Sequence, residues 1–455
     1  MEITEIELPA AVREVLCRLW AAGYEAYAVG GCVRDSLRGV APKDYDVTTS
    51  ALPEQTQRVF AGYRTIETGL RHGTLTVLCL GQAIEVTTYR IDGGYTDGRH
   101  PDSVTFTASL QADAARRDFT INAMAYAPDR KIMDFYGGRA DLAAHLIRAV
   151  GNPSARFDED ALRILRALRF ASVLGFTIEE KTAAALRAGA GRLDAVSPER
   201  IREELIKLLC GRAAESVLRD YADVVFTVLP ELAPMRGFEQ HSPYHCYDVW
   251  EHTLHAVGAI PPEPILRLAA LLHDAGKPAT FSLREGVGHF FGHAAASETL
   301  ADALLRRLRF DRATREEICR LVRHHDGVIE PEEKTIRRKL SRLGEQTFFR
   351  LLALQRADCE AQHPALRDRL KRLELCGEMA RRILDEQPCL GLSALAVNGD
   401  TLIRAGIAAP GRSLGATLSA LLDEVLEGKL ENSAEPLLRR AAALYPILQQ
   451  ESDNK

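Results

Sequence analysis

A change of pattern near residue 145 constrains the fold of this chain more than any other feature of its sequence. Before that point, strand-like runs mix with helical ones, and "GTLTVLCLGQAIEVTTYR", residues 73–90, predicts two strands around a Gly-Gln turn. After it, Ala, Leu, Arg and Glu recur with helical spacing almost to the end of the 455 residues. Because such a length exceeds one compact core, we expect a multi-domain protein, an N-terminal α/β part followed by an all-α remainder.

Local signals within the first part predict helices at residues 9–22 and 116–126, with a further strand and turn at "KIMDFYGGRADL". The segment "GNPSARFDED", residues 151–160, combines a Gly-Asn-Pro break with acidic residues suited to a helix start. It therefore marks the joint between the mixed part and the helical part.

Composition excludes several classes of protein. Apolar residues make up 46% and charged residues 27% of the chain, and no apolar run is long enough to span a membrane. The nine cysteines contain no Cys-x-x-Cys spacing, so neither a disulfide framework nor a zinc knuckle is indicated. With a net charge of −5, any nucleic-acid site must be a local basic patch. We expect a cytoplasmic protein without signal peptide or membrane partner, of undetermined oligomeric state.

Two aspartates, Asp44 and Asp46, lie two residues apart in "KDYDVTT". On a strand such residues face the same side, and their carboxylates repel each other unless a cation lies between them. Hard oxygen ligands suit Mg²⁺, and Glu85 in the strand-like "AIEVTT" would add a third acid. A lone Asp-x-Asp more often marks a surface turn, so the prediction depends on its neighbours.

A glycine pair, Gly30 and Gly31, lies upstream between a strand-like run and the helix-like "CVRDSLRG". Backbone amides at such a turn are suited to phosphate oxygens, and Arg34 could add a bidentate contact. The glycines, the aspartate pair and the strand acid together predict metal-assisted attack on a phosphorus atom.

The segment "GGCVRDSLRGVAPKDYDVTTS" resembles the nucleotidyltransferase signature of the polymerase-β superfamily. It is similar to the first motif of class II tRNA nucleotidyltransferases, the CCA-adding enzymes, and of bacterial poly(A) polymerases. "RRDFTINAMAY", residues 116–126, resembles the second motif of that family. The resemblance implies that Arg117 contacts the incoming nucleotide, while Asp118 and Asn122 support the site.

A third segment, "DEDALRILRALRFA", residues 158–171, is similar to the family's nucleotide-selecting helix. The resemblance implies that Asp160 and Arg163 meet the Watson–Crick edge of the base, while Arg166 and Arg169 hold the triphosphate. As i, i+3 neighbours on a helix, an Asp acceptor and an Arg donor can satisfy cytosine or adenine. A mismatched base would leave a buried polar group unpaired, at about 1–3 kcal/mol per group. The alternative is a solvated helix face with an ordinary salt bridge.

Two neighbouring segments bear on specificity and structure. "SPERIREEL", residues 197–205, resembles the next family motif, and we interpret it first as a helix start with Ser as N-cap. The loop "DGGYTDGRHPDSVTF", residues 92–106, resembles the flexible loop of complete CCA-adding enzymes. Asp97 and Arg99 fit, whereas His100 stands where the family usually has a second arginine. A plain surface loop is the alternative.

Nine of the thirteen histidines fall between residues 241 and 325, and "LLHDAGK" closes an apolar helical run. This pattern resembles the HD phosphohydrolase superfamily, which uses divalent metals such as Mn²⁺, Fe²⁺, Ni²⁺ or Co²⁺. The alternative is a metal-free helical domain. The resemblance implies metal ligands at His252, His273, Asp274 and Asp358, with His293 and His324 for a second metal.

The resemblance covers nearly the whole chain and implies four domains. These are a polymerase-β-like head at 1–145, a nucleotide-binding neck at 146–220, an HD body at 221–385 and a tail at 386–455. It implies Mg²⁺-dependent transfer of CMP, CMP and AMP from CTP and ATP to the 3′ end of tRNA. The RNA would lie on local basic surfaces such as "KTIRRKLSR", residues 334–342, which could equally be a solvated helix face. The alternatives are an A-adding enzyme or poly(A) polymerase, and a nucleotide-regulated HD phosphohydrolase.

Overall fold

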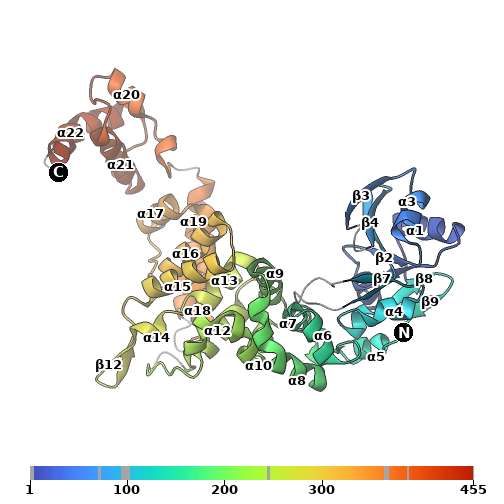
Figure 1. The fold of residues 1–455 in the computed structure, drawn as a ribbon. Coiled ribbons are helices and arrows are strands. Elements are labelled where there is room, and N and C mark those ends of the chain that lie inside the picture. The colour runs from blue at the N-terminus through green and yellow to red at the C-terminus, as the bar shows by residue number, and fades with distance from the viewer. Residues whose placement is uncertain are drawn as a thin grey trace. The chain divides into compact units, whose positions relative to one another are not determined.

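The computed structural model describes residues 5–69, 73–93, 103–242, 246–362, 368–386 and 389–453 (Figure 1). The chain forms two compact units. The first comprises residues 1–230 with 307–309, and the second comprises 231–306 with 310–455. The first contains the mixed α/β part and the helices that follow it, and the second is almost entirely helical. The expected order, an α/β head followed by helices, is confirmed.

A mixed sheet forms the head, with strand order β3-β4-β5-β2-β1-β8-β9. Among the described strand pairs of this sheet, only β2–β5 is parallel, and it places the start of β2 beside the middle of β5. Helix α1 (Ala10–Ala21) buries one apolar stripe that includes Val12, Leu16 and Leu19. The strands are β1 Ala26–Val29, β2 Asp46–Thr49, β3 Arg64–Gly69, β4 Thr74–Cys79, β5 Gln82–Thr88, β8 Ala125–Ala127 and β9 Lys131–Met133.

The segment expected to be a helix at residues 116–126 is not one. Helix α4 (Leu110–Ala115) ends before it, a single 3-10 turn covers Thr120–Asn122, and β8 follows. Phe119 is extended and bridges Ala149, and the Thr120 amide donates to the Arg148 carbonyl at 2.9 Å. These long-range backbone bonds hold the segment open, so tertiary pairing overrides its helical pattern.

The remaining elements of the first unit connect the sheet to a helical layer. Asn152 caps α6 through bonds to the amides of Ser154 and Ala155, as the joint motif predicts. The head elements are α2 Gly31–Leu37, α3 Pro53–Val59, β6 Arg90–Asp92, β7 Val104–Phe106 and α5 Gly138–Ala143. Then come β10 Leu146–Ile147, α6 Pro153–Glu159, α7 Leu162–Leu174, β11 Thr177–Ile178, α8 Glu180–Gly189, α9 Pro198–Leu209, α10 Ala214–Asp220 and α11 Ala222–Val228.

The second unit consists almost entirely of packed helices. The tail has its own core, which includes Leu395, Leu402, Leu421 and Leu437. None of the helices within the described ranges is long and apolar enough to cross a membrane. The elements are α12 Val249–Ala259, α13 Pro264–Leu272, α14 Lys277–Thr280, β12 Ser282–Arg284, β13 Val287–His289, α15 His293–Arg307, α16 Arg312–His324, α17 Glu333–Leu343, α18 Glu345–Glu360, α19 Asp368–Asp385, α20 Gly399–Arg404, α21 Arg412–Leu426 and α22 Ala434–Asp453.

Candidate functional site

The acidic edge of the sheet assembles from two strands. Asp46 opens β2 and is paired in register with Glu85 of the parallel strand β5, while Asp44 lies just before β2. Asp44 and Asp46 line a cavity of about 550 Å³, which we call the nucleotide pocket. Glu85 stands beside Asp46 in the sheet but is not among the residues that line the cavity.

Asp46 has an unusual electrostatic environment. Partial desolvation and the neighbouring charge of Glu85 raise its pKa to about 6, against the opposing effect of Arg117 and with a smaller contribution from Asp44. The carboxylates of Asp44, Asp46 and Glu85 disfavour one another's negative charge, and a divalent cation bound by their oxygens would relieve this repulsion. The donor set of this edge therefore suits a metal of the Mg²⁺ type.

The glycine pair brings backbone close to Arg117. Gly30 has φ of 77°, a conformation that L side chains rarely adopt, and a Cβ there would lie 3.2 Å from Nη1 of Arg117. Gly31 begins α2, and both glycines line the nucleotide pocket. The backbone angle favours glycine at position 30, and a Cβ there would also crowd the Arg117 side chain.

Asp113 is a residue that the sequence interpretation missed. Its side chain is fully buried and lies 2.9 Å from Nε of Arg116 and 3.5 Å from Nη2 of Arg117. It also accepts a bond of 3.2 Å from the hydroxyl of Thr48, two residues beyond Asp46. Although burial raises the pKa of Asp113, the two arginines lower it overall. Asp113 thus anchors Arg117 to the acidic strand, and an acid three and four residues before an Arg-Arg pair was the available signal.

A chain of polar contacts crosses the nucleotide pocket from head to neck. Arg34 donates to Oδ1 of Asn122 at 2.7 Å, and Asn122 donates to Asp118 at 3.1 Å. Arg166 of α7 donates twice to the same carboxylate, at 2.6 and 2.9 Å. Burial by itself raises the pKa of Asp118. The charge and hydrogen bonds of Arg166 and the hydrogen bond of Asn122 outweigh this effect and lower the pKa to about 2. The predicted supporting residues therefore form one network.

The predicted pairing of Asp160 with Arg163 is wrong. Asp160 is not helical: it ends α6 with φ −146° and ψ 103°, and its carboxylate is held by Arg200 at 2.8 Å. Arg163 instead bonds Glu159 at 2.6 Å. The helix breaks at Asp160, whose side chain accepts the Leu162 amide at 3.0 Å and so starts the next helix. Asp160, Arg163 and Arg200 all line the nucleotide pocket.

The remaining arginines also reach the cavity. Arg166 and Arg169 line it from α7, and Nε of Arg169 lies 2.8 Å from a carboxylate oxygen of Glu204. Arg200 and Glu204 belong to α9, whose start matches "SPERIREEL". That segment was interpreted first as structural, yet it supplies a pocket-lining side chain. The predicted specificity residues Asp97, Arg99 and His100 lie outside the described residues.

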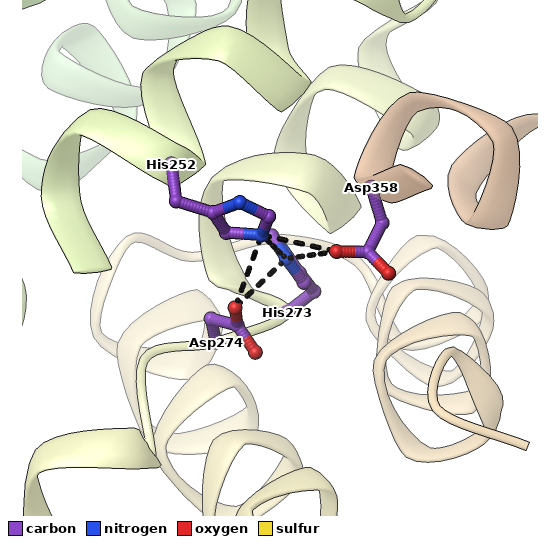
Figure 2. A group of neighbouring side chains, drawn as sticks. All are labelled: His252, His273, Asp274 and Asp358. Atoms are coloured by element: carbon purple, nitrogen blue, oxygen red, sulfur yellow. Dashed lines mark hydrogen bonds and ion pairs between the residues drawn. The ribbon is translucent and has the colours of Figure 1, made fainter. Parts of the chain in front are cut away.

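A second site lies among helices of the second unit (Figure 2). Nε2 of His252 lies 3.0 Å from Asp358 and 3.3 Å from Asp274, and Nε2 of His273 lies 3.2 Å from Asp274. His252 is on α12, His273 and Asp274 follow α13, and Asp358 is on α18. All four residues are buried, and one nitrogen or oxygen atom of each lies within 4.8 Å of the others, close enough to bind one metal ion.

The orientation of the imidazoles favours a cation. Nδ1 of His252 faces the Ala361 carbonyl at 3.3 Å, and Nδ1 of His273 faces the Ala270 carbonyl at 2.7 Å. A carbonyl only accepts, so each Nδ1 carries a hydrogen and each Nε2 points inward, where its lone pair would be offered to a cation once the proton leaves. The two Nε2 atoms lie 3.3 Å apart, and a shared cation would relieve their repulsion.

His325, rather than His324, completes a second group with Asp274 and His293. Nε2 of His325 lies 3.3 Å from Nε2 of His293 and 3.6 Å from Asp274. The prediction of His324 as a ligand is therefore corrected, since His324 is exposed. On α16 the buried residues Ile318, Leu321 and Val322 define the inner face, which the spacing continues to position 325.

The charges at this centre are strongly coupled. Burial lowers the pKa of His273, but Asp274 and Asp358 raise it overall, to about 10. Burial raises the pKa of Asp274, but the surrounding cations hold it well below its usual range. Lys277, which the sequence interpretation missed, is buried and lies 2.7 Å from Asp274 while donating to Gln240 at 2.8 Å. A pocket of about 320 Å³ opens beside Asp274, Lys277 and Asp358.

Three of the five basic residues at positions 334–342 form ion pairs within the described parts of the chain. Arg337 pairs with Glu333 at 2.7 Å, and Arg338 and Lys334 both pair with Glu427. These ion pairs lower the net positive charge that this helix presents. They favour the solvated helix face over a nucleic-acid contact.

Comparison with known families finds three matching regions. Residues 26–148 match the poly(A) polymerase head domain, and residues 244–362 match the HD domain. Residues 175–235 match a region described as the probable RNA- and SrmB-binding site of polymerase A. Nucleotidyltransferase and HD domains generally use divalent metals, and the HD region here holds a suitable donor set.

Curated relatives include CCA-adding enzymes from Limosilactobacillus fermentum and Latilactobacillus sakei. Each is 48% identical, over 211 and 220 residues, or 46% and 48% of this chain. These alignments cover 52% and 55% of the relatives, so the match spans about half of their length.

Solved structures of CCA-adding enzymes share the fold along almost the whole chain. The Bacillus stearothermophilus enzyme in complex with CTP is 29% identical, with a TM-score of 0.72 over 98% of each chain. The Thermotoga maritima enzyme complexed with tRNA is 22% identical, with a TM-score of 0.56 over 96% of each chain. The second likeness concerns the fold alone.

Proposed function

We propose that the chain is a CCA-adding enzyme, in line with its matches to a poly(A) polymerase head domain, a probable RNA-binding region of polymerase A and an HD domain. It would transfer CMP, CMP and AMP from CTP and ATP to the 3′ end of tRNA in the cytoplasm. The carrying observation is one pocket that combines four aspartates, Asp44, Asp46, Asp118 and Asp160, with a set of arginines: Arg34, Arg116, Arg117, Arg163, Arg166, Arg169 and Arg200. We further propose four domains: a head at 1–145, a neck at 146–220, an HD body at 221–385 and a tail at 386–455.

The acidic edge would hold Mg²⁺ through Asp44 and Asp46, with Glu85 beside them. Bound Mg²⁺ supplies charge stabilisation to a phosphoryl transfer and favours the deprotonated 3′-oxygen of the primer. The chain's own residues bind and orient the substrates. Gly31 and Arg34 line the pocket from the head and would face the triphosphate, and Arg117 lines the same pocket as the acids.

Base selection would come from the neck. Asp160 accepts hydrogen bonds and Arg163 donates them, as reading cytosine or adenine requires. Arg200 orients the Asp160 carboxylate, and Arg166 and Arg169 extend the positive wall for the triphosphate. No nucleic-acid template is needed, because side chains replace the complementary base.

The decisive experiment incubates the purified protein with tRNA that ends before CCA and with single labelled nucleotides. Incorporation from CTP followed by a single AMP supports CCA addition. Incorporation from ATP alone supports an A-adding enzyme if one residue is added, and poly(A) polymerase if long products form. No incorporation from either nucleotide would refute all three activities.

A second candidate activity belongs to the HD centre. The buried histidines and aspartates present inward donors beside an open pocket, as a metal-dependent phosphohydrolase requires. Mn²⁺, Ni²⁺, Co²⁺ or Fe²⁺ would be held by His252, His273, Asp274 and Asp358. Release of phosphate from nucleotide monoesters or opening of cyclic phosphodiesters, dependent on added metal and lost in His273→Ala, would establish it.

A further inference from the structure

Phe170 of helix α7 is the one aromatic side chain among the described residues that line the nucleotide pocket. It is only 7% exposed, so most of its ring is packed inside the protein. The fully buried Phe119 meets it edge-on, with ring centroids 5.7 Å apart and planes at 79°. The core therefore fixes the orientation of a ring that also borders the pocket.

Three guanidinium groups surround this ring. Cζ of Arg169 lies 3.8 Å from the ring centroid, and the Cζ atoms of Arg34 and Arg166 lie 5.2 and 5.6 Å from it. Arg34 comes from α2 of the head, whereas the other two share α7 with the ring. All three arginines line the nucleotide pocket. Because a cation within about 6 Å of an aromatic ring is attracted by its π electrons, the ring is a common contact for guanidinium groups from two parts of the chain.

Arg169 depends on the ring more than the other two arginines do. Carboxylate oxygens lie 2.8 Å from Arg34 and 2.6 Å from Arg166, and both carboxylates accept hydrogen bonds from these side chains. Nε of Arg169 lies 2.8 Å from Glu204, but within the described residues neither atom of that pair has a hydrogen-bond partner. Burial lowers the pKa of Arg169 against the opposing charge of Glu204, and the charges of Arg166 and Arg34 lower it as well. The stack on Phe170 is thus the closest oriented contact of a crowded cation.

We propose that Phe170 is a positioning residue that holds Arg34, Arg166 and Arg169 for the triphosphate of the incoming nucleotide. The inference rests on the proposed function, which supplies a nucleoside triphosphate. Guanidinium groups gathered for an anion repel one another before the anion binds. A carboxylate could hold them, but its charge would also repel the phosphates. An uncharged ring attracts the cations without this cost and keeps them in the arrangement that the triphosphate requires.

The test compares the full chain with Phe170→Leu, which keeps an apolar side chain and removes the aromatic face. KM for CTP and for ATP is expected to rise about fivefold, and Kd for inorganic tripolyphosphate, measured by calorimetry, to rise by a similar factor. Because contacts to the triphosphate are made in the ground state as well as the transition state, kcat changes less than about twofold. The preference for CTP over UTP and the KM for tRNA stay at their wild-type values, which a general loss of packing would not leave intact.

Two further variants separate the aromatic face from packing alone. Phe170→Tyr retains the aromatic face and is expected to restore KM for CTP to within about twofold of the wild type. Phe176→Leu is the matched control, because Phe176 is also 7% exposed and has Arg38 over its ring at 5.8 Å, yet it is not among the residues that line the nucleotide pocket. Its KM for CTP and its affinity for tripolyphosphate are expected to equal those of the wild type.

Each other outcome would decide against the inference. Equal tripolyphosphate affinity in the wild type and Phe170→Leu would overturn it, as would an equal loss in Phe176→Leu or a failure of Phe170→Tyr to restore KM. If Phe170→Leu does not fold, Phe170→Met replaces it with the same expected changes. If the wild type adds no nucleotide, the proposed function fails, while calorimetry with tripolyphosphate still tests the ring. A wild type that binds no tripolyphosphate would also contradict the positioning role.

Discussion

Arg200 holds the carboxylate of Asp160, with Nη2 2.8 Å from Oδ2 and Nη1 3.3 Å from Oδ1. The two residues are separated by 40 positions and come from different helices, α9 and the end of α6. Both line the nucleotide pocket. The direction in which Asp160 presents its acceptors therefore depends on α9 and not on its neighbour Arg163.

Arg200→Ala is expected to relax nucleotide choice. Without its partner the Asp160 carboxylate samples other orientations, so the ratio of kcat/KM for CTP to that for UTP falls about tenfold, equivalent to about 1.4 kcal/mol. Single-nucleotide incorporation assays measure this ratio. Lys207→Ala, exposed on the same helix, serves as the control and leaves the ratio unchanged. Equal discrimination by Arg200→Ala and wild type would contradict the positioning role.

Asp44→Ala and Asp46→Asn are expected to abolish transfer while the fold persists. Because the pKa of Asp46 is raised, its ionised form at neutral pH destabilises the folded protein when no metal is bound. Asp46→Asn is therefore expected to raise the free energy of unfolding by about 1 kcal/mol without metal, since water partly screens this exposed side chain. Added Mg²⁺ stabilises the wild type and not this variant. CTP incorporation and thermal unfolding measure both effects. The control is Asp129→Ala, which removes an exposed acid elsewhere in the head and is expected to retain activity. Normal turnover by a folded Asp46→Asn variant would disprove the metal assignment.

Asp118 makes a pH-dependent contribution to stability. Its folded pKa of about 2 lies below the ordinary 3.8, so the stabilisation is fully present above about pH 4 and is lost as pH falls towards 2. Asp118→Asn is expected to lower the free energy of unfolding by about 2 kcal/mol at pH 7, and less as pH falls below 4. Urea unfolding at several pH values measures the difference. A deficit that stayed constant down to pH 2 would contradict the ion pair with Arg166.

His324 and His325 form a matched pair for the HD centre. His325→Ala removes an inward Nε2, whereas His324→Ala changes an exposed side chain on the same turn. Metal analysis of protein loaded with Mn²⁺ or Ni²⁺ should show a lower metal content, by up to one ion per chain, for His325→Ala alone. Thermal unfolding checks that both variants are folded. The reverse pattern would restore the original assignment of His324.

Sequence spacing was sufficient wherever ligands share one local element. The Asp44–Asp46 pair and the Gly30–Gly31 turn were predicted from neighbouring residues, because a strand or a helix start sets their directions, and all four residues line the nucleotide pocket. The His273–Asp274 dipeptide was predicted from a family resemblance. The residues it missed, Asp113, Arg200 and Lys277, act through partners that only folding supplies. His324 was chosen over His325 because the helical period was not followed to the end of α16.

The amino-acid sequence by itself determined the α/β head, the helical remainder and the chemical types gathered at each site. Local propensity, periodicity and fixed spacing carry that information over a few residues. Only the tertiary structure decided where the helix breaks at Asp160, which arginine holds it, and which histidine faces Asp274. Those outcomes depend on contacts between distant segments, and their free energies appear only when the segments pack together.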